Sequence, residues 1–520
     1  MNIRTSCPSP EEQAQPSTER CPCGAMSDTL IELERLKSRL RDVSIRLERT
    51  ESELGIFKRT FAWRLNVFFV AVVHFFYILM RFVYLKISMS RSLQLRLIPY
   101  VSRISSWFRR QGVKLSGEIY DVDGYSSIHY VNELPPCSAP FDIYIFSNID
   151  WEYRMQRPQH LALELGKLGY RVFFVSSSFI DTLATGIHLR TGPINNVILV
   201  KMHAFGRPLI YYQAPSQDVN KQLSDSYRSL LVLSDKENPV IIIQHPFWHS
   251  ILQNTKQKCL IYDCIDYHYG FGNVMSSIVD LEHSLICDAN FIVATSKKLI
   301  ETHKAETKKH YIIRNASDFD FFSKKVENTM RLEKNKSVLG YYGAISDWFD
   351  LDLLAEIAKK FPECLCVLVG QDTVNAKNKL EPYPNVLFVG EVSYSELPFY
   401  LYRFDVCLLP FINNLLTEST NPLKVYEYLS AGKPVVAIDL PEMAHFGDIV
   451  YVSNDIGSFI SNIRKSLAEK GDEKLAARRR LFASQQTWRM RALDFERAIK
   501  KELSVTANPT MQSHLNFGEL

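Results

Sequence analysis

Two opposite charges lie one helical turn apart in the stretch NPLKVYEYLSAGKPVV, residues 421–436. Asn421 and Pro422 predict a helix start, because Asn caps free backbone N–H groups and Pro suits the first helical position. Lys424 then falls in the first turn, where the helix dipole disfavours a cation unless an anion lies between them. Glu427 follows three residues later on nearly the same face.

These two charges fit a nucleotide diphosphate. Lys424 would face the phosphates, and the carboxylate of Glu427 could accept two hydrogen bonds from a ribose diol. The alternative is an ion pair between the two residues, but Lys before Glu is the less favourable order and contributes only about 0.3 kcal/mol. The spacing therefore predicts a nucleotide-binding helix.

A second candidate phosphate contact is the turn in YYGAISDWF, where Gly343 and Ala344 directly follow a predicted strand. Small residues at a strand-to-helix turn let backbone N–H groups approach a phosphate. A tight turn without a ligand explains the same residues equally well.

Side chains suited to a reacting centre occur earlier in the chain. Asp266 and His268 lie in YDCIDYHYGF, at the predicted end of a strand. His268 could donate a hydrogen bond to a sugar or to a reacting phosphate, and the alternative is a His satisfied in the core or on the surface. We take both residues as candidate catalytic groups.

Gln156, Arg157, Gln159 and His160 follow the first predicted strand of that region. Because Arg157 precedes Pro158, we expect it in an extended turn, with its guanidinium free to meet a phosphate. Arg157 is therefore the third candidate catalytic residue, and Gln156 and Gln159 are candidates for the side that binds an acceptor. For Gln159 and His160 the alternative is capping and packing of the next helix.

Composition places the chain among globular proteins. Its 520 residues are enough for about two or three domains, with 46% hydrophobic and 23% charged residues. The net charge of +4 argues neither for nor against nucleic acid. The ten cysteines do not form a disulfide framework, and the pair Cys21 and Cys23 lacks further ligands at zinc spacing, so no metal site is predicted.

Two segments are expected before the globular part. Residues 1–27 are polar, with Pro and Ser, and are predicted to be a disordered tail without a secretory signal. Residues 28–55 place leucine every seven positions, which predicts a coiled coil through which the chain could self-associate. A single amphipathic helix packed on its own domain is the alternative.

Residues 56–116 contain eleven Lys and Arg residues but no Asp or Glu, around the apolar run LNVFFVAVVHFFYILM. An anionic membrane surface attracts this mixture, so we expect a cytoplasmic protein held peripherally at the inner face of the plasma membrane. A single membrane span near residues 65–85 is the alternative, although the run is shorter than the about 20 residues that a spanning helix needs. Nucleic acid is the poorer partner, because the apolar run would have no role there.

From residue 141 onward, apolar runs alternate with helical patterns, which predicts buried parallel strands. The polar stretch 322–336 is the best candidate linker, and the alternation restarts after it. We therefore predict two Rossmann-like, doubly wound α/β domains, at 117–330 and 331–505, followed by a tail at 506–520. A ligand is expected in the cleft between the domains, at the carboxyl ends of the strands.

The stretch NPLKVYEYLSAGKPVVA closely resembles the donor-site segment of GT-B glycosyltransferases of the family 4 type, which use nucleotide-sugars. The resemblance implies that Glu427 binds the ribose hydroxyls and that Lys424 contacts the donor phosphates. Thr420 and Asn421, directly before this helix, are counted with them as donor-binding residues.

Further stretches resemble, in the same order, a bacterial subgroup of this family that makes surface polysaccharides and cell-wall glycans. These stretches are WEYRMQRPQHLALEL (151–165), LIYDCIDYHYGF (260–271), ATSKKLIE (294–301), RNASDFDFF (314–322) and GYYGAISDWFDLDLL (340–354). The last is similar to the family's diphosphate loop, which includes Gly343 and Ala344. The coiled coil followed by FAWRLN is similar to N-terminal extensions of polysaccharide-assembly glycosyltransferases.

Two features depart from the family pattern. Ser419 stands where the first of two paired Glu residues is usual, with Glu418 one position away. In the family this first Glu contacts the sugar, so the positioning and identity of the sugar are open. The Arg that often follows the Gly turn is also missing, and Lys424 with backbone N–H groups is expected to bear more of the diphosphate charge.

The resemblance implies a glycosyltransferase of the hexosyltransferase type in polysaccharide biosynthesis. It would move a sugar from a nucleotide-diphospho-sugar, as co-substrate, to a glycan or lipid-linked acceptor, with retention of anomeric configuration. No essential metal or other cofactor is expected. A sugar-nucleotide epimerase of the same architecture and a non-catalytic scaffold are the alternatives.

Overall fold

The computed structural model describes residues 134–252, 255–272, 274–302, 309–327 and 336–507. The chain divides into two units, Met1–Ser126 and Ser127–Leu520, and the described residues all belong to the second. The predicted disordered tail, coiled coil and basic apolar segment lie outside the described residues, as does most of the C-terminal tail. Within the described part, no helix combines the length and the apolar character needed to cross a membrane.

The first sheet, with the helices that cover it, is called the N-lobe. Its strand order is β3-β4-β2-β1-β5-β6-β7-β8, and every pairing is parallel except that of β3 with β4. Five of the strands are buried along their whole length, as their continuous apolar runs predict. The strands are β1 (Ile143–Phe146), β2 (Val172–Val175), β3 (Ile187–Thr191), β4 (Val197–Met202), β5 (Val240–Ile243), β6 (Cys259–Cys264), β7 (Phe291–Ala294) and β8 (His310–Ile312).

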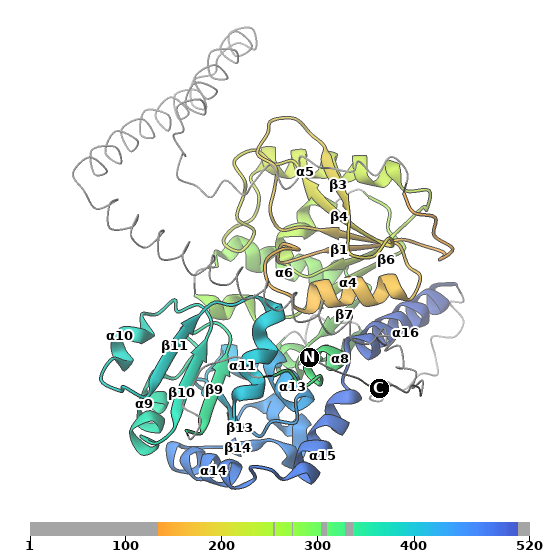
Figure 1. Ribbon diagram of the computed structural model, residues 1–520. Coiled ribbons are helices and arrows are strands. Elements are labelled where there is room, and N and C mark those ends of the chain that lie inside the picture. Colours follow the sequence, from red (N-terminus) through yellow and green to blue (C-terminus); the bar gives the residue numbers. More distant parts are fainter. Residues whose placement is uncertain (1–133, 253–254, 273, 303–308, 328–335, 508–520) are drawn as a thin grey trace, which may run out of the picture. The chain divides into compact units, whose positions relative to one another are not determined.

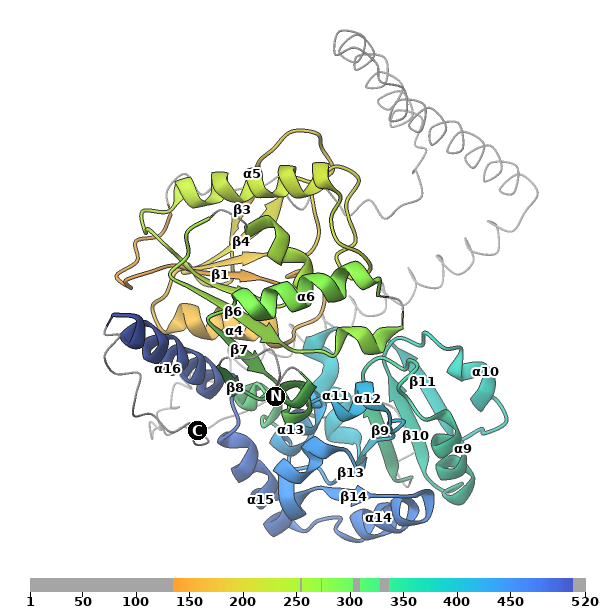
Figure 2. The same cartoon turned by 180° about the vertical axis from the view of Figure 1, so that it is seen from behind.

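Alternate residues of β1 enter two separate cores, one on each face of the N-lobe sheet. Tyr144 and Phe146 pack with residues of α5, η2 and α6, which Figure 2 shows in front of the sheet. Ile143 and Ile145 pack with α4 on the other face (Figure 1). The helices are α4 (Arg157–Lys167), α5 (Gln217–Leu233), η2 (Pro246–Leu252), η3 (His268–Phe271), α6 (Ser276–Asp288) and α7 (Lys297–Thr302). The short helix α8 (Phe319–Phe322) follows them in the chain but packs through Phe322 in the core of the second sheet.

The second sheet, with its helices, is called the C-lobe, and all of its pairings are parallel. Its strand order is β11-β10-β9-β12-β13-β14. The strands are β9 (Val338–Tyr342), β10 (Leu365–Val369), β11 (Val386–Gly390), β12 (Val406–Leu409), β13 (Val435–Ile438) and β14 (Tyr451–Ser453). The helices are α9 (Leu351–Lys360), α10 (Ala376–Leu380), η4 (Tyr394–Glu396), α11 (Leu397–Arg403), α12 (Leu415–Glu418), α13 (Leu423–Ser430), η5 (Pro441–Ile449), α14 (Ile456–Ala468) and α15 (Glu473–Ser484). The two predicted doubly wound domains are therefore present.

The last helix, α16 (Trp488–Ala507), leaves the C-lobe and packs beside α4 on the N-lobe (Figure 1). Phe495 and Ile499 of α16 are buried in the same core as Ile143 and Leu161. The predicted domain 331–505 is therefore wrong at its end, because the apolar face of this helix is covered by the other sheet.

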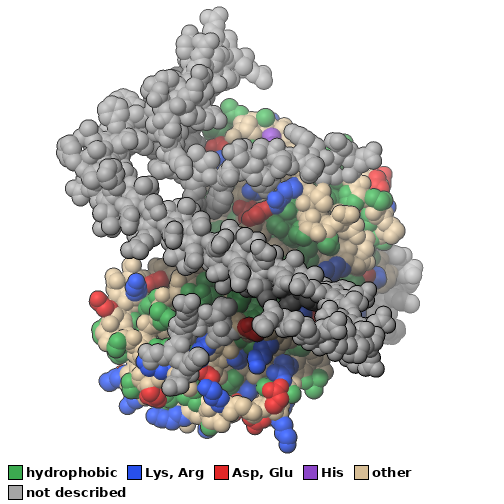
Figure 3. All heavy atoms as spheres, in the orientation of Figure 1, with side chains coloured by type: hydrophobic (Ala, Val, Ile, Leu, Met, Phe, Trp, Pro, Cys, Tyr) green, Lys and Arg blue, Asp and Glu red, His purple; other side chains and the backbone are tan. Residues whose placement is uncertain are grey.

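The part of the C-lobe that Figure 1 labels α14 and α15 carries a gathering of Lys and Arg side chains, with acidic groups among them (Figure 3). Arg478 pairs with Asp448, and Arg480 pairs with Glu473. Exposed pairs of this kind contribute little to stability because water screens them. We interpret this face as an ordinary solvated surface.

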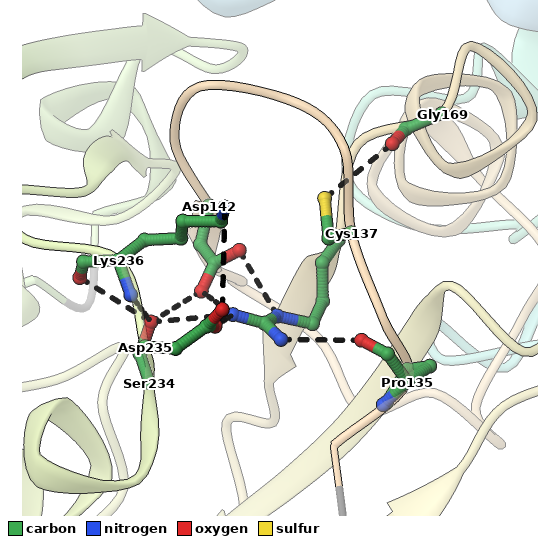
Figure 4. A network of polar contacts seen from close by, with 8 residues as sticks. Pro135, Cys137, Asp142, Gly169, Ser234, Asp235 and Lys236 are labelled. Carbon is green, nitrogen blue, oxygen red and sulfur yellow. Dashed lines mark hydrogen bonds and ion pairs between the residues drawn. The ribbon is translucent and has the colours of Figure 1, made fainter.

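A buried ion pair lies where β1 and β2 begin, at the amino edge of the N-lobe sheet (Figure 4). Arg171 donates from Nε to Asp142 Oδ1 at 3.0 Å and from Nη2 to Oδ2 at 2.7 Å, and both side chains are almost fully buried. Its Nη1 donates to the carbonyl oxygen of Pro135 at 3.1 Å, and Asp235 makes a further contact. The guanidinium thus ties the entering chain to two strands.

Arg171→Ala is expected to lower the free energy of unfolding by about 3–5 kcal/mol, because it leaves the Asp142 carboxylate buried without its cation. The change is measured as a shift of the urea unfolding midpoint. The matched control is Arg228→Ala, which removes an exposed pair with Asp225 and should cost less than about 0.5 kcal/mol. Equal shifts in the two variants would contradict the assignment.

Candidate active site

Helix α13 begins at Leu423, and Pro422 precedes it with φ −71° and ψ 107°. The expectation that Asn421 caps this helix is wrong, because its carboxamide is used elsewhere. Asn421 Nδ2 donates to Glu442 Oε2 at 2.9 Å, and its Oδ1 accepts from the backbone N–H of Asn315 at 2.9 Å. Its role as a donor ligand stays a prediction, although both ends of its side chain face the junction between the lobes.

Lys424 lies directly over the turn that follows β9. A methyl group at Gly343 would lie 2.8 Å from Lys424 Cε and 3.2 Å from Nζ, so the end of the lysine side chain packs on this turn, whose φ of 137° favours glycine. The rings of Tyr341 and Phe411 flank the ammonium, with centroids 5.5 and 5.2 Å from Nζ. The structure therefore brings together two segments that were predicted separately to meet a phosphate.

The ammonium of Lys424 is partly removed from water. Burial lowers its pKa to about 8; the charge of Glu427 opposes this shift, and that of Arg154 adds to it. Within the described residues, no ion pair joins Lys424 to Glu427 or to another carboxylate. The predicted alternative, a simple ion pair along the helix, is therefore wrong.

Glu427 is 4% exposed and faces the end of the same strand. The hydroxyl of Tyr342 donates to its Oε2 at 2.8 Å. Burial raises the pKa of Glu427 to about 7, against the opposing effects of the Tyr342 hydrogen bond and the Lys424 charge. No described side chain donates to Oε1, so this oxygen is placed to accept a hydroxyl of a ligand.

The turn after β9 offers fewer free amides than its sequence predicts. The N–H of Gly343 donates to Val369 O at 2.8 Å, and that of Ile345 donates to Gln371 O at 2.9 Å, so both are committed to the neighbouring strand end. Between them, the N–H of Ala344 donates to no described residue. Ala344, rather than Gly343, has the amide that could meet a phosphate.

The acceptor-side candidates Asp266 and His268 lie beyond the carboxyl end of β6. His268 is buried, and its ring centre lies 4.7 Å from that of His245. Burial, and secondly the charge of Asp263, raise the pKa of Asp266 to about 6. A methyl group at Gly270 would lie 3.3 Å from Leu416 Cβ in α12, so this segment touches the C-lobe directly before α13.

Arg157 is not free to meet a ligand. It is the first residue of α4 rather than part of an extended turn, and it is 4% exposed. Its guanidinium binds both carboxylate oxygens of Asp263, at 2.8–3.2 Å, and donates to Arg314 O and Asn315 Oδ1. The predicted free guanidinium is wrong, because a carboxylate 106 residues later satisfies it.

The polar residues beside Arg157 hold the loop before α4, as the packing alternative predicts. Gln159 Nε2 donates to the carbonyl oxygens of Asp150, Trp151 and Arg154, and its Oε1 accepts from the N–H of Gln156. The predicted acceptor-side roles of Gln156 and Gln159 remain untested, but the amide group of Gln159 is fully used inside the loop.

His160 also serves packing in this structure. Its ring stacks on Trp488 with centroids 4.9 Å apart, and burial lowers its pKa to about 3. It is therefore neutral at physiological pH and part of the contact between α4 and α16.

Sequence reasoning missed the junction that fixes α13 to the N-lobe. Glu442 is 2% exposed and accepts from the N–H of Lys297 at 3.0 Å, from Arg314 Nε at 2.8 Å and from Asn421. Asn315 Nδ2 donates to the carbonyl oxygen of Asn421 at 2.8 Å. Apart from Asn421 and Glu442, which are 21 residues apart, these partners are separated by more than 100 residues, so spacing could not reveal the junction.

The two residues that follow α12 form side-chain hydrogen bonds back to that helix. Thr420 Oγ1 donates to Leu416 O at 2.9 Å, and Ser419 Oγ donates to Leu415 O at 2.7 Å. Ser419, which stands at the expected position of a Glu, is 1% exposed and its carbonyl oxygen accepts from Ser296 Oγ. Because this position is closed to solvent, a larger charged side chain would require neighbouring atoms to move.

Sequence reasoning also missed Arg154, in the loop between β1 and α4. Its Nε donates to Glu391 Oε1 at 2.7 Å and its Nη2 to Gln371 Oε1 at 3.3 Å, so it crosses from the N-lobe to the C-lobe. Among the described residues, no group of three or more His, Cys, Asp or Glu could hold a metal ion. The expectation that no metal is essential stays a prediction.

Part of the C-lobe is similar to a known protein family. Residues 336–469 match the family described as glycosyl transferases group 1, and this range includes Gly343, Lys424 and Glu427. The chain is 28% identical over 255 residues to TuaH of Bacillus subtilis (strain 168), a candidate teichuronic acid biosynthesis glycosyltransferase. That match covers 44% of this chain and 64% of the relative, so the chain spans slightly less than two thirds of the relative's length.

Solved structures show the same fold at low identity. Sucrose-phosphate synthase from Thermosynechococcus elongatus superposes with a TM-score of 0.58 at 14% identity, covering 70% of this chain and 100% of that chain. HepE from Anabaena in complex with UDP superposes with a TM-score of 0.50 at 12% identity, covering 69% of this chain and 100% of that chain. The chain therefore has the two-lobed fold of these proteins, which resembles the GT-B fold, and its residues 336–469 are similar to the glycosyl transferases group 1 family.

Proposed function

We propose that the protein is a glycosyltransferase that moves a sugar from a nucleotide-diphospho-sugar to a hydroxyl group of an acceptor. The observation that carries this proposal is the position of Lys424 over the Gly343 turn, with Glu427 one helical turn later. The group 1 family match covers these residues, and a similar fold binds UDP in the Anabaena structure.

In the proposed complex the diphosphate lies between Lys424 and the free amide of Ala344, and the ribose hydroxyls donate to Glu427. The bond between the anomeric carbon and the phosphate oxygen breaks, and a new bond forms from that carbon to the acceptor oxygen. Lys424 and the Ala344 amide stabilise the negative charge that develops on the leaving diphosphate. The ionised carboxylate of Asp266 is the candidate group to accept the proton that the acceptor hydroxyl loses.

The acceptor is proposed to be a glycan or a lipid-linked glycan in polysaccharide biosynthesis. The name of the Bacillus subtilis relative supports this class. The same proposal includes retention of the anomeric configuration. It also places the protein at the inner face of the membrane through residues 56–116 and lets it self-associate through residues 28–55. The location is tested by flotation with phosphatidylglycerol vesicles, in which the full chain is compared with a chain that lacks residues 56–116.

A sugar-nucleotide epimerase is the second candidate, because the same architecture and nucleotide pocket would serve it. The two are separated by incubating the protein with a radiolabelled nucleotide-sugar and following the label. Transfer to an acceptor with release of the nucleoside diphosphate supports a transferase. An epimerised nucleotide-sugar formed without any acceptor would contradict it.

Lys424→Ala is expected to weaken nucleoside diphosphate binding by about 10- to 100-fold, because a charge-assisted contact contributes about 1.5–3 kcal/mol. Titration calorimetry with UDP, ADP and GDP measures it. Lys359→Ala, which removes an exposed Lys on α9, is the matched control and should leave binding unchanged. Equal binding by both variants would contradict the assigned phosphate contact.

Nucleoside diphosphate affinity is expected to be greatest between about pH 7 and pH 8. Below pH 7, protonation of Glu427 removes its acceptor charge, and above pH 8 Lys424 loses the proton that attracts phosphate. Calorimetry across pH 6–9 measures this profile. Glu427→Gln should flatten the acidic limb and Lys424→Arg the alkaline limb, and an unchanged profile in both variants would contradict these roles.

A further inference from the structure

The C-lobe alone gives the proposed donor diphosphate little positive charge. Lys424 supplies one cation, and Ala344 supplies one backbone amide. A nucleoside diphosphate carries more than one negative charge, and buried phosphate groups are usually met by several charge-assisted donors. A further cation beside this turn would therefore complete the site.

Arg154 is positioned by a rigid part of the N-lobe. Its carbonyl oxygen accepts a hydrogen bond from Gln159 Nε2 at 2.8 Å, and the same amide holds Asp150 and Trp151. The loop that carries Arg154 is thus fastened to the first turn of α4. The arginine side chain leaves this loop toward the C-lobe.

The guanidinium of Arg154 reaches the strand ends that form the donor turn. Its partner Gln371 directly follows Gly370, and its partner Glu391 directly follows Gly390. A methyl group at Gly370 would lie 2.0 Å from Gly343 O, so Gly370 and Gly343 are in contact. Arg154 therefore stands at the edge of the same turn that Lys424 covers.

The present partners of Arg154 hold it only weakly. The side chains of Arg154 and Glu391 are 28% and 48% exposed, and ion pairs of this exposure contribute about 0–1 kcal/mol. Arg157, three residues later, is by contrast buried against Asp263. Of these two arginines, Arg154 is the one that can exchange its carboxylate for an anionic ligand.

We propose that Arg154 is a second diphosphate-binding residue, supplied by the N-lobe, and that it exchanges Glu391 for the donor phosphates. The diphosphate is then held between Lys424 of one lobe and Arg154 of the other. Burial is the main cause of the lowered pKa of Lys424, and the charge of Arg154 adds to it, so the two cations lie close enough to interact. This inference rests on the proposed function, because it assumes that a nucleoside diphosphate binds at the Gly343 turn.

The test compares Arg154→Ala with Glu391→Ala, because the two variants break the same ion pair. Titration calorimetry with UDP, ADP and GDP identifies the diphosphate that the wild type binds most tightly, and its monophosphate is measured alongside. Arg154→Ala should weaken diphosphate binding about tenfold or more and monophosphate binding less than threefold. Glu391→Ala should leave diphosphate binding unchanged or tighter, since it frees the guanidinium.

If the ion pair of Arg154 with Glu391 only held the two lobes together, both variants would weaken diphosphate binding equally. That outcome would overturn the inference, as would diphosphate binding that depends on Lys424 but not on Arg154. If the wild type binds none of the three nucleotides, the proposed function itself fails. Because both side chains are partly exposed, both variants should unfold at the wild-type temperature, which circular dichroism checks.

Discussion

The end of the Lys424 side chain packs on the glycine turn that follows β9. A methyl group at Gly343 would lie 2.8 Å from Lys424 Cε, and a methyl group at the neighbouring Gly370 would lie 2.0 Å from the carbonyl oxygen of Gly343, so that Gly370 requires glycine. Gly343 and Gly370 thus allow the Lys424 ammonium to lie close to the ends of β9 and β10. A side chain at Gly370 would collide with the backbone of Gly343, and a side chain at Gly343 would displace the end of the Lys424 side chain from the turn.

This arrangement is unfavourable for an isolated protein. Lys424 sits between two aromatic rings with no carboxylate partner among the described residues, and Glu427 is buried beside a single tyrosine hydroxyl. Removing charges from water costs free energy unless something pairs with them. A ligand that brings phosphate oxygens to one side and hydroxyl groups to the other would offset that cost. The proposed donor site therefore accounts for charges that folding alone does not explain.

A chain of buried polar contacts joins this region to the N-lobe. Asp263 holds Arg157, Arg157 reaches Asn315, Asn315 binds Asn421 through two hydrogen bonds, and Asn421 continues to Glu442. Asn421, two residues before α13, is thereby connected to Asp263 at the end of β6, and the segment that follows β6 carries Asp266. These side chains therefore fix the position of α13 relative to the segment that carries Asp266, although they need not touch a substrate themselves.

The sequence predicted what depends on local pattern. Continuous apolar runs indicated the buried parallel strands, and the ends of parallel strands meet at one edge, so Lys424, Glu427 and the Gly343 turn came together as expected. Arg157 and Asn421 were misjudged, because polar residues beside a predicted site look alike in sequence whether they face a ligand or a distant carboxylate. The apolar stripe of α16 likewise does not reveal which sheet covers it. Arg154 and Glu442 carried no signal in spacing at all.

A crystal structure of the complex with the nucleoside diphosphate that binds most tightly tests the central claim most directly. The account predicts the diphosphate between Lys424 and the Ala344 amide, and the ribose hydroxyls within hydrogen-bond distance of Glu427. A nucleotide bound at another strand end, or one whose ribose leaves Glu427 without contact, would contradict it.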